Sequence, residues 1–140
     1  MTHNTGFASL KNSKTMTRKI KIHWSLKCAL TCVYAYIIYA VSSQDTSSIP
    51  LPIHLDKLIH FAEYGILCTF VCWVVSSFPI TSAKIFYLIT IGITSLYGIS
   101  DEFHQSFTPH RSVEIHDWLA DTTGAAAASF FWRIFLQKHL

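Results

Sequence analysis

Polar side chains that can transfer protons or bind an anion stand in three short stretches of an otherwise apolar sequence. In the first stretch, HLDKLIHFAEY, the residues Asp56, His60 and Tyr64 are spaced four apart. Positions i, i+4 and i+8 share one face of a helix, so a carboxylate, an imidazole and a phenol face the same side. Such groups act as general acids, general bases and hydrogen-bond donors in active sites.

The second stretch, YGISDEFHQSFTPHR, directly follows the apolar run Ile85–Ile99. It supplies Asp101, Glu102, Gln105 and Arg111. The guanidinium of Arg111 is a planar fork that donates paired hydrogen bonds to a phosphate or a carboxylate. This stretch therefore combines proton-transfer groups with a group that can hold an anion.

In the third stretch, HDWLADTTGAAAA, two acids are followed by small residues on one helical stripe. Asp117, Asp121, Gly124 and Ala128 are spaced i, i+4, i+7 and i+11. Small residues let a helix pack closely on a neighbour inside a membrane. Carboxylates at membrane depth face protein or water rather than lipid, so the acidic part of the stripe must point into a helix bundle.

The composition indicates that a bilayer surrounds these stretches. The 140-residue chain is 51% hydrophobic and only 14% charged, against about 25% charged residues in a typical soluble domain. Its apolar segments approach the roughly 20 residues that cross a hydrocarbon core about 30 Å thick. We predict an all-α polytopic membrane domain over residues 22–140, with four transmembrane helices at about 24–41, 58–78, 85–105 and 118–136. A disordered basic tail is expected over residues 1–21.

Two prolines limit where the second span can start. Pro50 and Pro52 stand just before it, and we expect them to prevent regular helix before Asp56.

Charge is distributed unevenly about the predicted spans. With four spans, all lysines and arginines except Lys57 and Arg111 fall on one side, and every Asp and Glu falls on the other side or just inside it. Basic residues are retained in the cytoplasm during insertion. Both termini are therefore predicted to be cytoplasmic, and the acidic face extracytoplasmic.

This topology brings the three polar stretches together, although up to sixty residues separate them in the sequence. The start of the second span, the end of the third and the start of the fourth all reach the outer face. We therefore expect an extracytoplasmic cup of carboxylates, imidazoles and one guanidinium, opening into the outer third of the membrane.

The motifs resemble those of the VanZ-like family, which is named for a protein associated with low-level teicoplanin resistance. The resemblance covers about residues 55–133 and rests on Asp56…His60…Tyr64, then Asp101-Glu102-x-x-Gln105-x-Phe107-x-Pro109-x-Arg111, then Asp117…Gly124. It implies a small multi-pass protein of the bacterial cell envelope, located in the cytoplasmic (inner) membrane. Two positions depart from the family pattern: His110 stands where glycine is usual, and Asp121 where asparagine is usual.

The cup suggests acid–base chemistry on an envelope component. Carboxylates and imidazoles in a partly dry site have their protonation equilibria pushed apart by desolvation and by one another. We take Glu102, Asp117 and His60 as candidate catalytic residues. The candidate ligand-binding residues are Asp56, Tyr64, Asp101, Gln105, Arg111 and Asp121. The first hypothesis is an enzyme or binding protein for a lipid-linked or peptidoglycan-related anion, linked by the resemblance to glycopeptide (teicoplanin) resistance.

Two other functions stay open at this point, because no nucleophile with its base can be named from the sequence. In one, the protein is a non-catalytic binding or scaffold protein whose polar network is structural. In the other, it is a small transporter, although neither repeated halves nor polar groups near the midplane are visible.

The expected partners and cofactors are few. The Asp and His spacings at positions 56/60, 101/104 and 117/121 would suit zinc or manganese, but Asp and His are common at helix ends, and neither a metal nor another cofactor is expected. The lipid bilayer is a partner, no stripe for nucleic acid is present, and the oligomeric state is left open.

The charge distribution predicts how reporter fusions behave. Alkaline phosphatase, which folds only outside the cytoplasm, should be active when fused after Ser48. It should be inactive after Ser82, and green fluorescent protein should fluoresce at the C terminus. The reverse pattern, measured as phosphatase activity and cell fluorescence, would contradict the predicted orientation.

Overall fold

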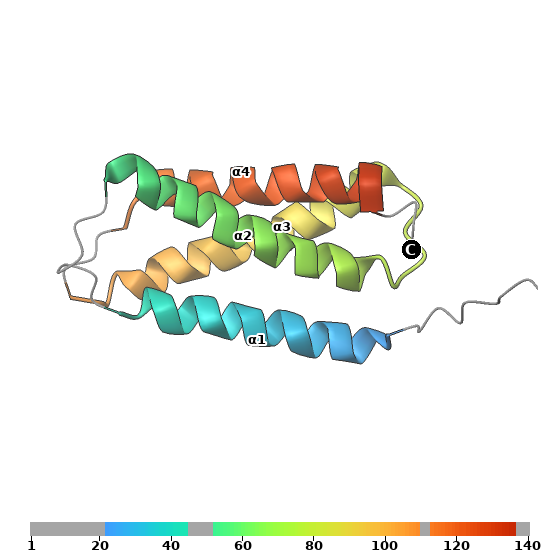
Figure 1. The fold of residues 1–140 in the computed structure, drawn as a ribbon, viewed down its shortest axis with the longest axis horizontal. Helices are drawn as coiled ribbons and strands as arrows, with labels where there is room; N and C mark the ends of the chain where they lie inside the picture. The colour runs from blue at the N-terminus through green and yellow to red at the C-terminus, as the bar shows by residue number, and fades with distance from the viewer. Residues whose placement is uncertain (1–21, 45–51, 110–112, 137–140) are drawn as a thin grey trace, which may run out of the picture.

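The chain forms helices that run up and down alongside one another (Figure 1). The structure, a computed structural model, describes residues 22–44, 52–109 and 113–136. Helix α1 is Trp24–Ser42, α2 is Ile53–Val75, α3 is Ala83–Gln105 and α4 is Ile115–Phe131. A π-helical turn, η1 (Trp132–Leu136), continues α4. The prediction of an all-helical domain with four helices is confirmed.

Three of these helices are long and apolar enough to cross a membrane. They are Trp24–Ser42, Leu55–Val75 and Ala83–Gln105, with mean hydropathies of 1.4, 1.8 and 1.4. Helix α4 has 17 residues and carries Asp117 in its first turn, so it falls short of the roughly 20 residues of a typical span.

Large apolar side chains cover the outside of the bundle. Tyr36, Leu88 and Leu96 are 68%, 64% and 66% exposed, and many more apolar residues share this outward face. A soluble monomer rarely exposes contiguous apolar surface of this extent. Together with the hydropathy of three helices, this surface identifies a membrane protein.

Helix α2 starts earlier than predicted. It begins at Ile53, directly after Pro52, whose φ is −57°. The expectation that no regular helix precedes Asp56 was wrong, because a proline at a helix start has a suitable φ and its missing N–H leaves no hydrogen bond unmade. The early start places Asp56 in the first turn, where the helix dipole favours a negative charge.

The tightest packing in the bundle joins α2 to α4. A Cβ placed on Gly124 would overlap the carbonyl oxygen of Phe61 and lie 2.9 Å from its carbonyl carbon. On α2, Gly65 faces Gly124 across the same contact. The small-residue stripe therefore lets the two backbones touch, as the sequence of α4 suggested.

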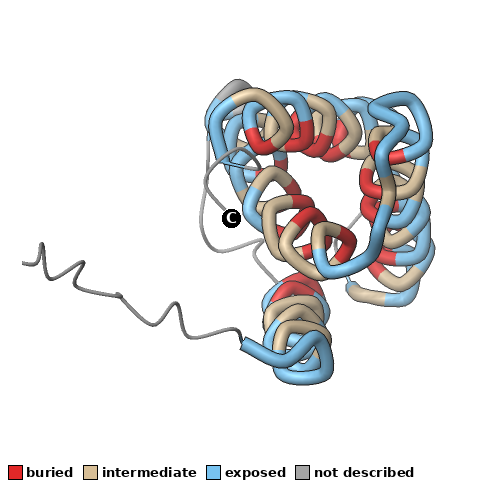
Figure 2. The backbone as a smooth tube through the Cα atoms, turned by 90° about the vertical axis from the view of Figure 1, so that its right-hand side faces the viewer, coloured by how far each residue is buried: buried red, intermediate tan, exposed pale blue. Residues whose placement is uncertain are grey.

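The bundle divides into an apolar and a polar half. Buried apolar side chains fill the half where α2 and α4 end, around Cys72, Phe86 and Trp132. The opposite end, where α2 and α4 begin and α1 and α3 finish (Figure 1), holds most of the buried charged residues. Helix α1 lies to one side, and the buried faces of the other three helices turn toward one another (Figure 2).

The contact at Gly124 predicts that adding one methyl group separates α2 from α4. Gly124→Ala should lower the free energy of unfolding by about 1–3 kcal/mol, as overpacking does. Gly92→Ala is the matched control, because nothing lies within 4 Å of its added Cβ, and it should be neutral or slightly stabilising. Thermal unfolding in detergent, followed by circular dichroism, measures both. Equal stability of the two variants would contradict the close contact.

Candidate functional site

Polar side chains from three helices gather at one end of the bundle, and we call this group the polar cluster. Helix α2 supplies the first four members, α3 the next three and α4 the last two: Asp56, Lys57, His60, Tyr64, Asp101, Glu102, Gln105, Asp117 and Asp121. The i, i+4 spacing on each helix turns successive members inward. Six of the nine, namely His60, Asp101, Glu102, Gln105, Asp117 and Asp121, are buried polar residues.

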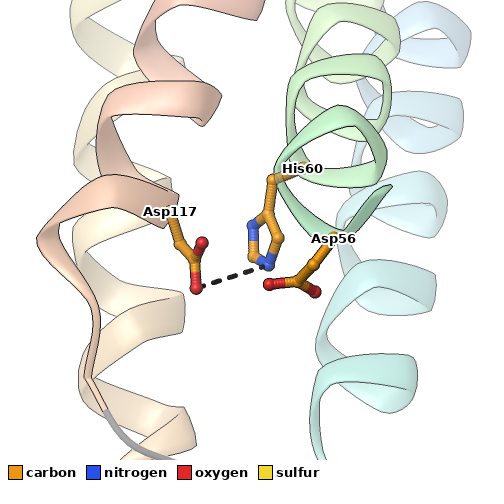
Figure 3. Close-up of side chains that lie close together, drawn as sticks. All are labelled: Asp56, His60 and Asp117. Atoms are coloured by element: carbon orange, nitrogen blue, oxygen red, sulfur yellow. Dashed lines mark ion pairs between the residues drawn. The ribbon is translucent and has the colours of Figure 1, made fainter. Parts of the chain in front are cut away.

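His60 lies between two carboxylates of α4. Its Nδ1 is 3.0 Å from Asp121 Oδ1, a hydrogen-bond distance, and its Nε2 is 3.9 Å from Asp117 Oδ2. The ring is 6% exposed. Figure 3 shows His60 pointing from α2 toward Asp117, with Asp56 on the same side of α2. The imidazole is thus oriented by acids on both nitrogens, which is the arrangement of a positioned general acid or base.

Lys57 places a positive charge at the partly exposed edge of the polar cluster, which we call its mouth; the Lys57 side chain is 25% exposed. Its ammonium binds Asp117, lies 2.7 Å from Glu114 and 3.3 Å from Asp56. The Asp117 carboxylate therefore stands between a lysine on one side and His60 on the other. Because the Asp117 side chain is only 9% exposed, this lysine supplies compensation that water does not.

Asp101 is held by hydrogen bonds from two helices. Its Oδ1 accepts from the hydroxyl of Ser42 at 2.6 Å, and its Oδ2 accepts from the Gln105 amide at 3.0 Å. The first bond joins the end of α1 to α3. Both carboxylate oxygens are thus engaged by the protein, so this part of the polar cluster fixes helix positions.

Gly98 on α3 leaves space for two members of the polar cluster, Asp121 of α4 and Tyr64 of α2. A Cβ at this position would lie 3.0 Å from Asp121 Oδ2 and 3.4 Å from Tyr64 Cε1. Tyr64 is fully buried and its ring is parallel to that of His60, with centroids 6.5 Å apart. The missing side chain therefore lets Asp121 and the tyrosine ring approach the α3 backbone.

Glu102 connects the end of α3 to the start of α4. Its Oε2 accepts a hydrogen bond of 3.0 Å from the backbone N–H of Glu114. Its other oxygen is buried, and no hydrogen-bond partner for it is found among the described residues. One oxygen thus fixes the carboxylate, and the second is left for another group.

The structure places all but one of the candidate catalytic and ligand-binding residues that the sequence indicated. Arg111 lies outside the described residues; the others belong to the polar cluster. The sequence reasoning missed Lys57, Glu114 and Ser42 as members of the polar network. Lys57 carried a signal, because it is one of only two basic residues on the acidic side of the predicted topology. Ser42 carried none, since its role depends on how α1 packs.

Two overlapping sets of residues have the geometry to hold a metal ion. Asp56, His60 and Asp117 form one set, and His60, Glu102 and Asp121 form the other. Within each set, one candidate ligand atom per residue lies within 4.8 Å of the others. His60 belongs to both, so a single ion would have to use one set.

An apolar groove of about 460 Å³ runs between α2 and α4 beside the polar cluster. It begins at Phe61, the residue after His60, and extends along Gly65 and Ala128 to Leu136. Its length follows the bundle from the polar end toward the apolar end. A groove of this shape fits a hydrocarbon chain better than a polar ligand.

Comparison with known proteins adds the family. The sequence model of the family described as VanZ/LLP1 matches residues 3–136, nearly the whole chain. Neither a curated protein nor a solved structure matches.

The environment of Lys57 predicts unequal effects for its removal and for the removal of its exposed partner. Lys57→Met leaves the buried Asp117 carboxylate without its ammonium, and should cost about 1.5–3 kcal/mol of stability. Glu114→Gln breaks an ion pair whose acid is 48% exposed and should cost less than about 1 kcal/mol. Thermal unfolding of both variants in the same detergent tests this. Similar losses would show that burial of Asp117 does not decide the effect.

Proposed function

Because the chain belongs to the VanZ-like family, we propose that this membrane protein works in the bacterial cell envelope, on the anionic headgroup of a lipid-linked component bound at the polar cluster. Teicoplanin resistance is the phenotype that we expect this activity to affect. Family membership supports the envelope setting, and the geometry of the polar cluster supports the chemistry.

The observation that carries this proposal is the position of His60 between Asp117 and Asp121, at 6% exposure. Carboxylates on both sides hold the ring in one orientation, which prepares a proton-transfer group. Glu102 lies in the same set of neighbouring ligand atoms. In the proposed activity, His60 and Glu102 exchange protons with the ligand, and Asp117 orients His60.

Charge at the mouth supports an anionic headgroup. Lys57 lies there at 25% side-chain exposure, and the sequence places Arg111 in the adjoining loop. An ammonium and a guanidinium are the side chains that most often bind phosphate. The nearby apolar groove from Phe61 to Leu136 supports a lipid-linked ligand, because it gives a hydrocarbon chain a place beside the headgroup.

The placement in the membrane belongs to the same proposal. Helix α4 and the turn η1 form a fourth span, with both termini in the cytoplasm and the polar cluster at the extracytoplasmic face. Helix α1 starts at the end of the bundle where α4 finishes (Figure 1). This is consistent with both termini on the same side of the membrane. A headgroup would then reach the polar cluster from outside the cell.

A second candidate function has its own support. Asp101 is fully engaged by Ser42 and Gln105, and Lys57 joins α2 to residues at the start of α4. Bonds of this kind would also serve a non-catalytic binding or scaffold protein whose network only fixes helix positions.

Glu102→Gln distinguishes the two functions. The amide keeps an acceptor for the Glu114 N–H but removes the ionisable carboxyl group, and with it both the negative charge and the capacity for acid–base catalysis. We expect the variant to stay in the membrane at the wild-type level. Its activity on a polyprenyl diphosphate should fall at least tenfold. This activity is measured as phosphate release or, by mass spectrometry, as modification of the lipid. In a sensitive host, the variant should also lose any teicoplanin resistance that the wild type confers.

Glu114→Gln is the matched control, because it removes a neighbouring acid and leaves that backbone N–H in place. Loss of the Glu102 variant from the membrane would favour the scaffold. So would a wild-type protein that neither binds nor alters the lipid.

A further inference from the structure

The second metal-capable set, formed by His60, Glu102 and Asp121, unites one residue from each of α2, α3 and α4. Their exposures are 6%, 5% and 1%, and their candidate ligand atoms lie within 4.8 Å of one another. No two of these residues are close in the sequence. The packing of three helices therefore produces a three-donor arrangement around one small volume.

Two carboxylate oxygens in this set lack a protein donor. Glu102 uses Oε2 to accept from the Glu114 N–H, and Asp121 uses Oδ1 toward His60. Glu102 Oε1 and Asp121 Oδ2 are fully buried, and neither has a hydrogen-bond partner within the described part of the chain. Leaving a buried acceptor unsatisfied is costly, and native structures rarely do so without an ion, a ligand or water.

Charge compensation in the polar cluster is also unequal. Asp117 binds Lys57, and Asp101 receives two hydrogen bonds. In the part of the bundle that the structure describes, no ion pair joins Glu102 or Asp121 to a lysine or an arginine, and Asp121 pairs with His60. Two buried carboxylates and one imidazole are the donors with which proteins hold divalent transition-metal ions.

The other set is less suited to an ion. Asp56 and Asp117 both already bind the Lys57 ammonium. A metal ion at that position would have to displace this lysine or lie against its charge. The set with unengaged oxygens is therefore the better candidate.

We propose that His60, Glu102 and Asp121 bind one divalent cation of the Mn²⁺ or Zn²⁺ type, and that the cation binds a phosphate of the lipid headgroup. The second half rests on the proposed function, in which His60 and Glu102 would then act as ligands of the cation in place of exchanging protons with the headgroup. Three protein ligands leave coordination positions open, which is the pattern of catalytic rather than structural sites. A bound cation would also explain how an acidic cluster accepts an anion, since its charge offsets the two carboxylates. The Asp and His spacings in the sequence would suit such an ion, although no metal was expected from them because both residue types are common at helix ends.

Asp117 takes a defined role in this site. With one ring nitrogen of His60 on the cation, the other nitrogen faces a carboxylate, as ligating histidines usually require. A cation on Nδ1 would replace the hydrogen bond between Nδ1 and Asp121 Oδ1, and Nε2 would then face Asp117 Oδ2, which is 3.9 Å away, as its orienting group. Lys57 in turn holds Asp117, so the chain of contacts reaches from the mouth to the cation.

Direct titration of Mn²⁺ tests the site without any lipid ligand. Full-length protein in nanodiscs of phosphatidylcholine is stripped with a chelator and titrated while electron paramagnetic resonance reports free Mn²⁺. The wild type should bind one ion, and both Asp121→Asn and Glu102→Gln should bind it at least tenfold more weakly. Gly92→Ala, whose added Cβ meets nothing within 4 Å, should bind like the wild type.

Several outcomes would overturn the site. They are no binding by the wild type, equal binding by the Asp121→Asn variant, or a loss confined to Asp56→Asn, which would assign the ion to the other set. Absence of binding by the wild type would overturn the site even if a variant fails to fold. A second titration with Zn²⁺, read by mass spectrometry of the desalted protein, covers the other ion of the proposed class.

A measurement of lipid binding tests the bridging cation separately from the proposed function. Nanodiscs that also contain a polyprenyl phosphate should show lipid bound to the protein by native mass spectrometry, and chelation should reduce that binding at least tenfold. Lipid bound equally well after chelation would refute the bridging cation and leave the proposed function standing. If the protein binds Mn²⁺ but no polyprenyl phosphate in these nanodiscs, the result would support the metal site and count against the lipid-linked ligand.

Discussion

A carboxylate inside an apolar helix bundle needs a donor or a cation beside it, and the rest of this structure depends on how that need is met. Asp101, Glu102, Asp117 and Asp121 are all nearly inaccessible. Removing such charges from water costs several kcal/mol each, even after relaxation. Most of these partners lie on neighbouring helices, so the acids gain their hydrogen bonds and ion pairs only when the helices pack together. A change that moves one helix also removes the partner of an acid on another.

Close backbone contact makes these pairings possible. Gly124 meets the backbone of α2 near Phe61, and Gly98 admits Asp121 and Tyr64 against α3. Bulkier residues at either position would push the helices apart and lengthen the contacts to His60. The two glycines thus set the geometry of the polar cluster by fixing how closely α2, α3 and α4 approach one another.

The polar cluster has two physically different parts. Around Asp101, the oxygens are engaged by Ser42 and Gln105, and this part fixes α1 on α3. Around His60, carboxylate oxygens of Glu102 and Asp121 stay without donors among the residues that the structure describes. The first part resembles a structural network and the second a binding site. Both readings of the sequence, enzyme and scaffold, therefore find support in different residues.

The sequence by itself determined the helices, their apolar faces and the family, because periodicity, span length and motif spacing are local properties. It also placed every member of the polar cluster except Lys57 on helix ends that topology brings together. The start of α2 was misjudged, since a proline prevents helix in the residue before it but can stand directly before the first helical residue, as Pro52 does. Only the tertiary structure decided which side chains form pairs. These pairs are Lys57 with Asp117, Ser42 with Asp101, and His60 with Asp121. These pairings depend on the rotation of each helix about its axis and on the close contacts at Gly124 and Gly98, which no spacing in one segment specifies.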